Sequence, residues 1–352
     1  MTLEPDLLFD RRGAAGLITL NRPRALNAVT AEMVRRLAQK LEEWEADPAV
    51  TRIVLTANGD RAFSAGGDLR ALYDLGRAAR HDEQLAFFRD EYRLNARIKR
   101  YRKPYISLID GMVMGGGVGI SVHGSHRVAG DKLLFAMPEV GIGFFPDVGA
   151  TWFLPRLPGQ LGTYCALTGE RLKTADAVGV GVATHRVASA RFAELADALC
   201  GDISVDAVIG AFSEPAGNGP VLDAKAAINR FFRYDSVEEI LTEFDRAATA
   251  KNADASFALA TAASMRTKCP TSLKIALAQM RAGAAMDFEE CMRTEFRIVS
   301  RVVHGPNFYE GIRAAIVEKD QTPRWQPDSV SAVGAEEIAR FFAPLASELR
   351  LP

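Results

Sequence analysis

The chain has 352 residues, of which 48% are hydrophobic and 25% are charged, a balance that excludes a disordered or fibrous protein and allows one large domain or two ordinary ones. Its 43 lysines and arginines nearly match its 44 aspartates and glutamates, so the formal net charge is -1. We therefore expect neither a nucleic acid partner nor an acidic membrane surface, and any anionic ligand must be bound by local groups.

The predicted elements of the first 60 residues alternate between strand and helix. Residues 16–20 form a β-prone run, and Thr30 is a candidate N-cap for the helix that follows. The apolar stripe of this helix has helical spacing: Met33, Leu37, Leu41 and Trp44. Residues 52–56 then read as a buried strand that leads into a glycine-rich turn.

The same alternation continues to about residue 200. A long helix is predicted over residues 83–100, strands over 105–109 and 135–136, and a helix that opens in the 115–117 glycine run and continues through Val122. This order predicts an α/β (α+β) core. From residue 204 onward strand signals fade, so we predict a core over residues 1–203 and a mostly helical domain over 204–352.

The helical signals of the second part lie in three segments: residues 224–232, 236–250 and 285–303. The N-terminus has no basic region followed by an apolar run, and the most apolar long stretch, residues 106–122, is interrupted by Asp110 and several glycines. A span of about 20 apolar residues is needed to cross a bilayer. We therefore expect a cytoplasmic protein without a membrane span.

The cysteines and histidines show no ligand or disulfide pattern. Four cysteines lie far apart without a Cys-x-x-Cys pair, which fits a reducing compartment and a packing role: Cys165, Cys200, Cys269 and Cys291. The five histidines form no metal-ligand spacing, so we predict no metal site.

Two glycine-rich turns are the first candidate functional feature. Residues 65–68 and 115–119 each follow a predicted strand and open a predicted helix, so each offers unpaired backbone N–H groups at the positive end of a helix dipole. Two such turns can direct two donors at one oxygen, as an oxyanion hole for an acyl carbonyl does. The alternative is that the glycines only permit tight strand-to-helix packing.

Glycine motifs of other enzyme classes do not match. Residues 115–119 are followed by Ile120 where a dinucleotide-binding motif needs glycine, no Gly-Lys-Ser/Thr follows, and His123 stands where a nucleophile elbow needs its last glycine. Acyl chemistry in this chain therefore needs a carboxylate.

Three acids are candidates for that carboxylate. Glu139 and Asp147 bracket the apolar residues 140–146, so their carboxyls are expected to be partly desolvated with a raised pKa, which suits acid–base work or covalent attack. The third acid, Glu91, lies inside the apolar stripe of its predicted helix, with Phe87, Leu94 and Ile98. The alternatives are a helix cap or structural hydrogen bond for the first two, and a buried ion pair for Glu91.

Four motifs together resemble the crotonase (enoyl-CoA hydratase/isomerase) superfamily in order and spacing. They are Pro-Arg-Ala-Leu-Asn-Ala at 23–28, Phe-Ser-Ala-Gly-Gly-Asp-Leu at 63–69, Gly-Gly-Gly at 115–117 and Met-Pro-Glu at 137–139. The resemblance implies a spiral of ββα repeats that presents an acyl-CoA thioester to the N–H groups of Gly67 and Gly116. It also implies substrate contacts for five further residues, with the first three beside the CoA nucleotide: Arg24, Ala25, Leu26, Gly66 and Asp68.

Within the superfamily the chain departs from the hydratases, whose first catalytic glutamate position is occupied here by Gly119. Segments 106–111, 135–139 and 143–149, and the tail at 270–274 and 307–321, resemble instead the 3-hydroxyisobutyryl-CoA hydrolases. This resemblance implies hydrolysis of a short 3-hydroxyacyl-CoA thioester, most closely 3-hydroxyisobutyryl-CoA of valine breakdown.

In that reaction Glu139 is the expected central carboxylate, and it either attacks the thioester or activates water. Asp147 and Glu91 are expected to hold the substrate hydroxyl and orient water, and Asp147 can exchange roles with Glu139. No cofactor is expected beyond the CoA of the substrate, and the family permits a homotrimer or hexamer. The alternatives are a hydratase or isomerase that uses Glu139 and Asp147, and a catalytically silent acyl-CoA-binding protein.

Overall fold

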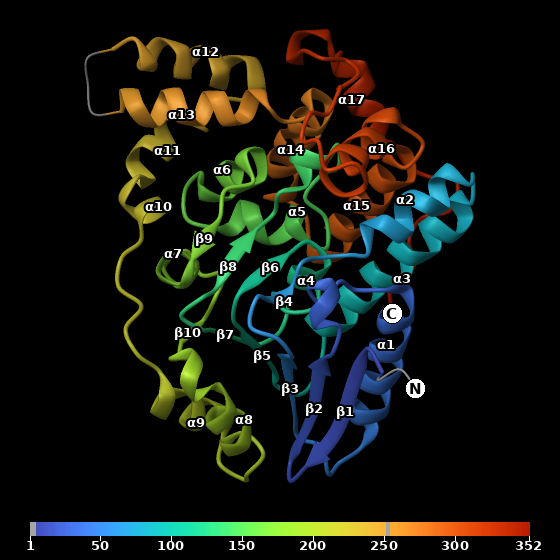
Figure 1. Cartoon of the computed structure of the whole chain (residues 1–352), viewed down its shortest axis with the longest axis vertical. Coiled ribbons are helices and arrows are strands. Elements are labelled where there is room, and N and C mark those ends of the chain that lie inside the picture. Colours follow the sequence, from blue (N-terminus) through green and yellow to red (C-terminus); the bar gives the residue numbers. More distant parts are fainter. Residues whose placement is uncertain (1–4, 251–253) are drawn as a thin grey trace.

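The computed structural model describes residues 5–250 and 254–352 and contains two β-sheets enclosed by helices (Figure 1). The larger sheet has six strands in the order β1 (Leu7–Arg12), β2 (Ala15–Leu20), β3 (Arg52–Ala57), β5 (Tyr105–Ile109), β7 (His126–Ala129) and β10 (His185–Arg186). The smaller sheet has four in the order β4 (Ala62–Ser64), β6 (Met112–Met114), β8 (Leu134–Ala136) and β9 (Leu172–Lys173). All neighbouring strands are parallel except β1 with β2 and β8 with β9.

The chain passes repeatedly from the larger sheet to the smaller one and then into a helical segment. The strand pairs β3–β4, β5–β6 and β7–β8 each contribute one strand to each sheet. The helical segments that follow are α2 (Leu69–Arg77) with α3 (His81–Lys99), then α4 (Gly116–Gly119), then η2 (Glu139–Ile142) with α5 (Ala150–Phe153). This winding is the predicted spiral of ββα repeats, and the predicted fold class is confirmed.

Helices complete the first part of the chain. They are η1 (Pro23–Ala25), α1 (Ala31–Ala46), η3 (Leu154–Arg156), α6 (Leu161–Thr168), α7 (Thr174–Gly179), η4 (Ser189–Arg191) and α8 (Phe192–Ala198). Thr30 caps α1 as predicted, since its side chain accepts a hydrogen bond from the N–H of Met33.

After residue 204 the described elements are all helical, apart from an isolated bridge between Arg186 and Glu214. They are α9 (Val205–Phe212), α10 (Pro220–Asp223), α11 (Lys225–Phe231), α12 (Val237–Ala248), α13 (Ala255–Arg266), α14 (Pro270–Gly283), α15 (Phe288–Val302), α16 (Pro306–Ile312), η5 (Arg313–Val317), η6 (Val330–Ala332) and α17 (Ala335–Phe342). The α12–α13 hairpin stands at the upper edge of Figure 1, whereas α14 to α16 lie beside the spiral.

The apolar core joins the two parts of the chain. Tyr92 of α3 meets Phe296 of α15 edge-on, and Phe144 lies 5.4 Å, between ring centroids, from Phe308 of α16. These side chains belong to one continuous buried cluster. The boundary near residue 203 stays a prediction.

Two local expectations differ from the structure. The helix predicted through Val122 is only the four-residue α4, because three of its four residues are glycine and each glycine costs about 1 kcal/mol relative to alanine in a helix. The edge strand β1 was not predicted, since most of its side chains are solvent-facing and three of its six residues are charged. The four cysteines are free and buried, as expected, and none of the described helices has the length and apolarity needed to cross a bilayer.

Candidate active site

A small cavity of about 70 Å³ lies where the two glycine-rich turns meet η2 and the middle of α3. Six of the predicted site residues line it: Gly66, Gly67, Glu91, Gly116, Glu139 and Asp147. The other lining side chains are mostly apolar, among them Leu72, Phe87, Phe88, Ile142 and Phe144. Tertiary folding thus brings polar groups from five separate segments into a largely apolar pocket.

The two turns touch one another. A Cβ atom placed on Gly116 would lie 3.2 Å from the backbone nitrogen of Gly67, and one placed on Gly66 would lie 3.7 Å from the nitrogen of Gly116. Gly66 has a φ of 109°, which favours glycine. Gly116 is the first residue of α4, so its N–H has no partner within the helix. The nitrogens of Gly67 and Gly116 are therefore neighbours that can face one substrate oxygen.

Upstream residues hold the first turn in place. The backbone N–H of Ala65 donates to the carbonyl of Leu26 at 2.9 Å. The buried amide of Asn27 donates to the carbonyls of Asn58 and Ala62. The motif at residues 23–28 thus fixes the turn that carries Gly67.

Glu91 lies beside the second turn. It is 2% exposed, and its Oε1 lies 2.5 Å from the position of a Cβ on Gly116. No hydrogen-bond partner for this oxygen exists in the described part of the chain. Burial, followed by the charges of Asp147 and Glu295, raises the pKa of Glu91 well above its ordinary value. The predicted inward orientation is confirmed, and a buried ion pair does not account for it.

Glu139 begins η2 at the rim of the same turn. Its Oε1 lies 3.3 Å from the position of a Cβ on Gly115, and its buried Oε2 has no hydrogen-bond partner among the described residues. Burial, with the charge of Asp147 next, raises the pKa of Glu139 well above its ordinary value. An unpaired buried carboxyl is costly and therefore points to a functional role.

Asp147 differs from Glu139 in being anchored. The hydroxyl of buried Tyr92 donates to its Oδ2 at 2.9 Å. Burial raises the pKa of Asp147 to about 7, although the hydrogen bond from Tyr92 acts in the opposite direction. Asp147 therefore changes its charge near neutral pH.

A fourth buried acid, Glu295 of α15, was missed by the sequence analysis. It is fully buried, and its oxygens accept hydrogen bonds from the N–H groups of Gly149 and Thr151 at 2.8 and 2.9 Å. Burial, with the charge of Asp147 next, raises its pKa to about 8. Its neighbours at helical spacing are apolar, namely Cys291, Met292, Val299 and Val302. The stripe signal that singled out Glu91 could therefore have found it.

Four predicted substrate-binding residues lie outside the inner cavity. Arg24 and Ala25 are exposed on η1, and Leu26 lies directly after it in a left-handed conformation. Asp68 caps α2 by accepting from the N–H of Ala71, and it pairs with Arg22 at 3.4 Å.

Asp68 also lines an outer cavity of about 340 Å³. Leu72 and Phe87 line both this cavity and the inner one. The outer cavity thus adjoins the inner one. We define the acid cluster as Glu91, Glu139, Asp147 and Glu295. No group of three histidine, cysteine or acidic side chains within residues 5–250 and 254–352 is arranged to hold a metal ion.

Comparison with known proteins places the chain among acyl-CoA enzymes. The family model described as enoyl-CoA hydratase/isomerase matches residues 15–342. The chain is 43% identical to 3-hydroxyisobutyryl-CoA hydrolase, mitochondrial, of Danio rerio, over 97% of this chain and 90% of the relative. It is 40% identical to the Homo sapiens protein of the same name, over 97% and 89%.

Solved structures agree in fold. A carnitinyl-CoA dehydratase from Mycobacterium thermoresistibile has a TM-score of 0.92 and 38% identity, over 99% of both chains. An enoyl-CoA hydratase from Rhodobacter sphaeroides has a TM-score of 0.90 and 37% identity, over 99% of this chain and 100% of that one.

Proposed function

The chain belongs to the enoyl-CoA hydratase/isomerase family and, within it, to the 3-hydroxyisobutyryl-CoA hydrolases, and from this premise we propose that it hydrolyses 3-hydroxyisobutyryl-CoA to 3-hydroxyisobutyrate and CoA. The observation that carries the proposal is the position of Glu139. Its Oε2 is buried without a hydrogen-bond partner in the described part of the chain, beside the turn whose N–H groups can stabilise an oxyanion.

The first chemical step forms an oxyanion. When a nucleophile adds to the thioester carbonyl, negative charge develops on the oxygen, and the N–H groups of Gly67 and Gly116 stabilise it. Loss of one such donor typically slows a reaction about 100- to 1,000-fold. The largely apolar lining strengthens these hydrogen bonds because it excludes water.

Glu139 supplies the carboxylate for that step. In one route its oxygen bonds to the thioester carbon, the carbon–sulfur bond breaks, and the thiolate takes a proton from a neighbouring acid; water then hydrolyses the mixed anhydride. In the other route Glu139 removes a proton from water, which attacks directly. Asp147 titrates near pH 7 and is the proton donor of the cluster in either route.

The remaining acid of the pocket, Glu91, faces the same turn and is the group proposed to hold the substrate hydroxyl. Burial raises its pKa well above the ordinary value, which favours the protonated form that can donate a hydrogen bond. The outer cavity, which Asp68 lines, is the proposed path of the CoA moiety.

A thiol-release assay tests the proposal. Wild-type protein is expected to release free thiol from 3-hydroxyisobutyryl-CoA, and Glu139→Gln is expected to lose at least 100-fold in kcat while its far-UV circular dichroism stays unchanged. Glu194→Gln, which removes a charge from a surface pair with Arg191, is the matched control and should retain kcat. Wild-type kcat in Glu139→Gln would reject the central role of that carboxylate.

The runner-up activity is hydration or dehydration of an enoyl-CoA, because the two similar solved structures carry hydratase and dehydratase names. A pair of buried acids, Glu139 and Asp147, is available for it. Loss of enoyl absorbance on crotonyl-CoA without thiol release would favour this activity, and tight CoA binding without turnover of any thioester would favour a silent binding protein.

Three accompanying expectations belong to this proposal. No cofactor is needed, since the thioester already carries an activated acyl group. A homotrimer or hexamer is the assembly that the family resemblance implies. The sequence analysis expects a cytoplasmic location, whereas the names of the animal relatives include the word mitochondrial. Subcellular fractionation of the native source distinguishes the two locations.

A further inference from the structure

The turn that carries Asp147 is strained. Val148 has a φ of 52° and Gly149 a φ of 91°. A β-branched residue in the left-handed region costs on the order of 1–3 kcal/mol and persists only where its surroundings fix it. The backbone directly after the catalytic aspartate is therefore held by its neighbours.

Two neutral side chains contribute to that restraint. Nε2 of buried His123 donates to the carbonyl of Val148 at 2.7 Å. The amide of Gln279, on α14, donates to the carbonyl of Pro146 and to the hydroxyl of Thr151 at 3.0 and 2.8 Å. The turn is thus anchored on both sides of Asp147 to elements distant in sequence.

Glu295 is the acidic restraint. Its two oxygens each accept one backbone N–H, from Gly149 and from Thr151, and the side chain of Thr151 also hydrogen-bonds to it. A carboxylate matches two converging N–H donors, whereas an amide offers one acceptor and one unsuitable donor. The shape of this turn therefore requires a carboxylate at position 295.

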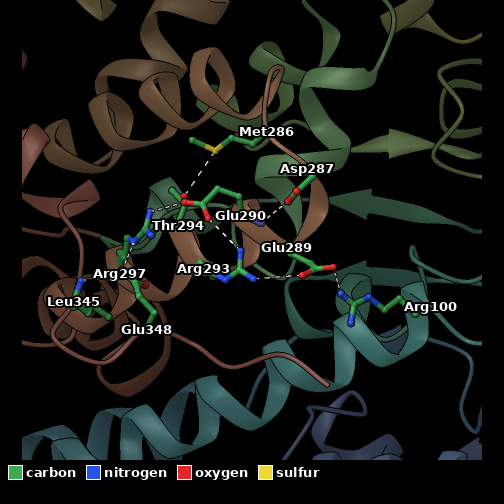
Figure 2. A network of polar contacts seen from close by, with 10 residues as sticks. All are labelled: Arg100, Met286, Asp287, Glu289, Glu290, Arg293, Thr294, Arg297, Leu345 and Glu348. Atoms are coloured by element: carbon green, nitrogen blue, oxygen red, sulfur yellow. Dashed lines mark hydrogen bonds and ion pairs between the residues drawn. The ribbon is translucent and has the colours of Figure 1, made fainter.

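The inward side of α15 differs from its outer side. Figure 2 shows Glu289 and Glu290 in a surface network with Arg100, Arg293 and Arg297. Those two glutamates are 39% and 35% exposed, whereas Glu295 is fully buried and has no cation partner among the described residues. An ion pair therefore does not explain the charge at position 295.

Several titratable groups face Glu295 or the acids coupled to it. Glu91 and Tyr92 belong to α3, Glu139 to η2, and Asp147 to the turn. His123 stays neutral near pH 7 because burial lowers its pKa to about 3, with Lys99 and Arg127 acting in the same direction. The charge of Glu295 adds to burial in raising the pKa of Glu91 and Glu139.

We infer that Glu295 is a positioning residue for the proposed hydrolysis: from the C-terminal helix α15 it holds the 147–151 turn so that Asp147 faces the cavity. The inference rests on the proposed function and extends it to a side chain that does not line the cavity.

The test compares Glu295→Gln, Glu295→Asp and Glu289→Gln with wild type on 3-hydroxyisobutyryl-CoA. Glu295→Gln is expected to lose about 10- to 100-fold in kcat with a KM change below about threefold, since misplacement of a catalytic group by about 1 Å costs up to 100-fold. In this variant the acid limb of the kcat profile against pH should move to lower pH, because Glu295 no longer contributes to raising the pKa of Glu139. Glu289→Gln should behave as wild type.

Glu295→Asp keeps the charge on a shorter side chain. It is expected to lose kcat while the pH midpoint stays that of wild type, and it carries the test alone if Glu295→Gln does not fold. Wild-type kcat in Glu295→Asp, or wild-type kcat and pH midpoint in folded Glu295→Gln, would overturn the inference and leave Glu295 a structural residue.

A second readout is independent of turnover. The titration of the Glu139 carboxyl, followed by ¹³C NMR, is expected to move to lower pH in Glu295→Gln and to stay unchanged in Glu289→Gln. If wild type releases no thiol, the proposed function fails, and this titration still decides the role of Glu295; an unmoved Glu139 midpoint counts against it.

Discussion

At the scale of single residues, the site combines groups whose roles differ through their partners. Asp147 is bonded to Tyr92, and Glu295 is bonded to two backbone N–H groups, whereas Glu91 and Glu139 each keep a buried oxygen without a partner. Burial raises the pKa of all four carboxyls. An unpartnered oxygen is free to meet substrate or water, whereas the hydrogen bonds of Asp147 and Glu295 fix the positions of their carboxyls.

Gly116 has no room for a side chain. A Cβ on it would lie 2.5 Å from Oε1 of Glu91, so Gly116→Ala is expected to displace that carboxyl and the adjoining N–H donor, with a loss of about 100-fold in kcat. Gly210→Ala is the control, because nothing lies within 4 Å of a Cβ there, and it should keep kcat and slightly raise the Tm. Equal kcat in the two variants would contradict the described contact.

Asp147 makes stability depend on pH. Its pKa in the folded protein is about 7 against an ordinary 3.8, so the native state holds this proton more tightly than the unfolded chain does. Its contribution to stability is complete below about pH 4 and is lost as the pH rises through 7. We expect Asp147→Asn to be inactive. Between pH 5 and pH 8 its free energy of unfolding should fall less than that of wild type, and the difference between the two falls should be on the order of a few kcal/mol.

Thermal unfolding of wild type and Asp147→Asn at pH 5 and pH 8 measures this difference in stability. The charge of Asp147 also raises the pKa of the other three acids, so the comparison measures the contribution of Asp147 together with its coupling to them. Parallel loss of Tm in wild type and Asp147→Asn would show that Asp147 is not protonated in the folded protein near pH 7.

At the scale of elements, two helices each contribute one acid from an otherwise apolar stripe. α3 presents Glu91 and α15 presents Glu295, and Tyr92 packs on Phe296 where the helices meet. The α12–α13 hairpin does not contribute to the site, since its side chains do not line the inner cavity. Its stability should therefore be separable from activity.

The N-cap of α12 tests that separation. The hydroxyl of Ser236 accepts from the N–H of Glu239 and donates to its carboxylate, so Ser236 caps α12. Ser236→Ala is expected to lower stability by about 1 kcal/mol and to leave kcat unchanged, whereas Ser236→Asp should restore most of the Tm. A fall in kcat without a change in Tm would contradict this assignment.

At the scale of the whole molecule, the spiral core and the C-terminal helices share one apolar cluster. α14 and α15 also supply Gln279 and Glu295, which hold the 146–151 turn. The predicted two-part division of the chain therefore describes secondary structure content and leaves open whether either part folds alone.

A chain limited to residues 1–203 tests this point. Removal of α14 to α16 would expose Phe144 and Tyr92, which contact those helices, and would leave the strained turn without two of its restraints. We expect this fragment to be insoluble or inactive. Soluble fragment with wild-type thiol release would show that the first 203 residues form an independent catalytic domain.

The sequence by itself determined the local features. Periodicity located β2, β3, β5, α1 and α3, and it oriented Glu91 inward, because alternation and helical spacing are properties of neighbouring residues. The glycine turns and the apolar segment between Glu139 and Asp147 also follow from local composition, as does the capping role of Thr30.

Only the tertiary structure decided which groups meet. Glu295 lies 146 residues from Gly149 in the chain, and its contact with that turn depends on how α15 packs against α3 and α5, which no local pattern encodes. The contact between the Gly67 and Gly116 turns arises in the same way, from the stacking of successive ββα repeats. A helical stripe shows that an acid faces inward, but the partner that gives the acid its role is set by packing between distant elements.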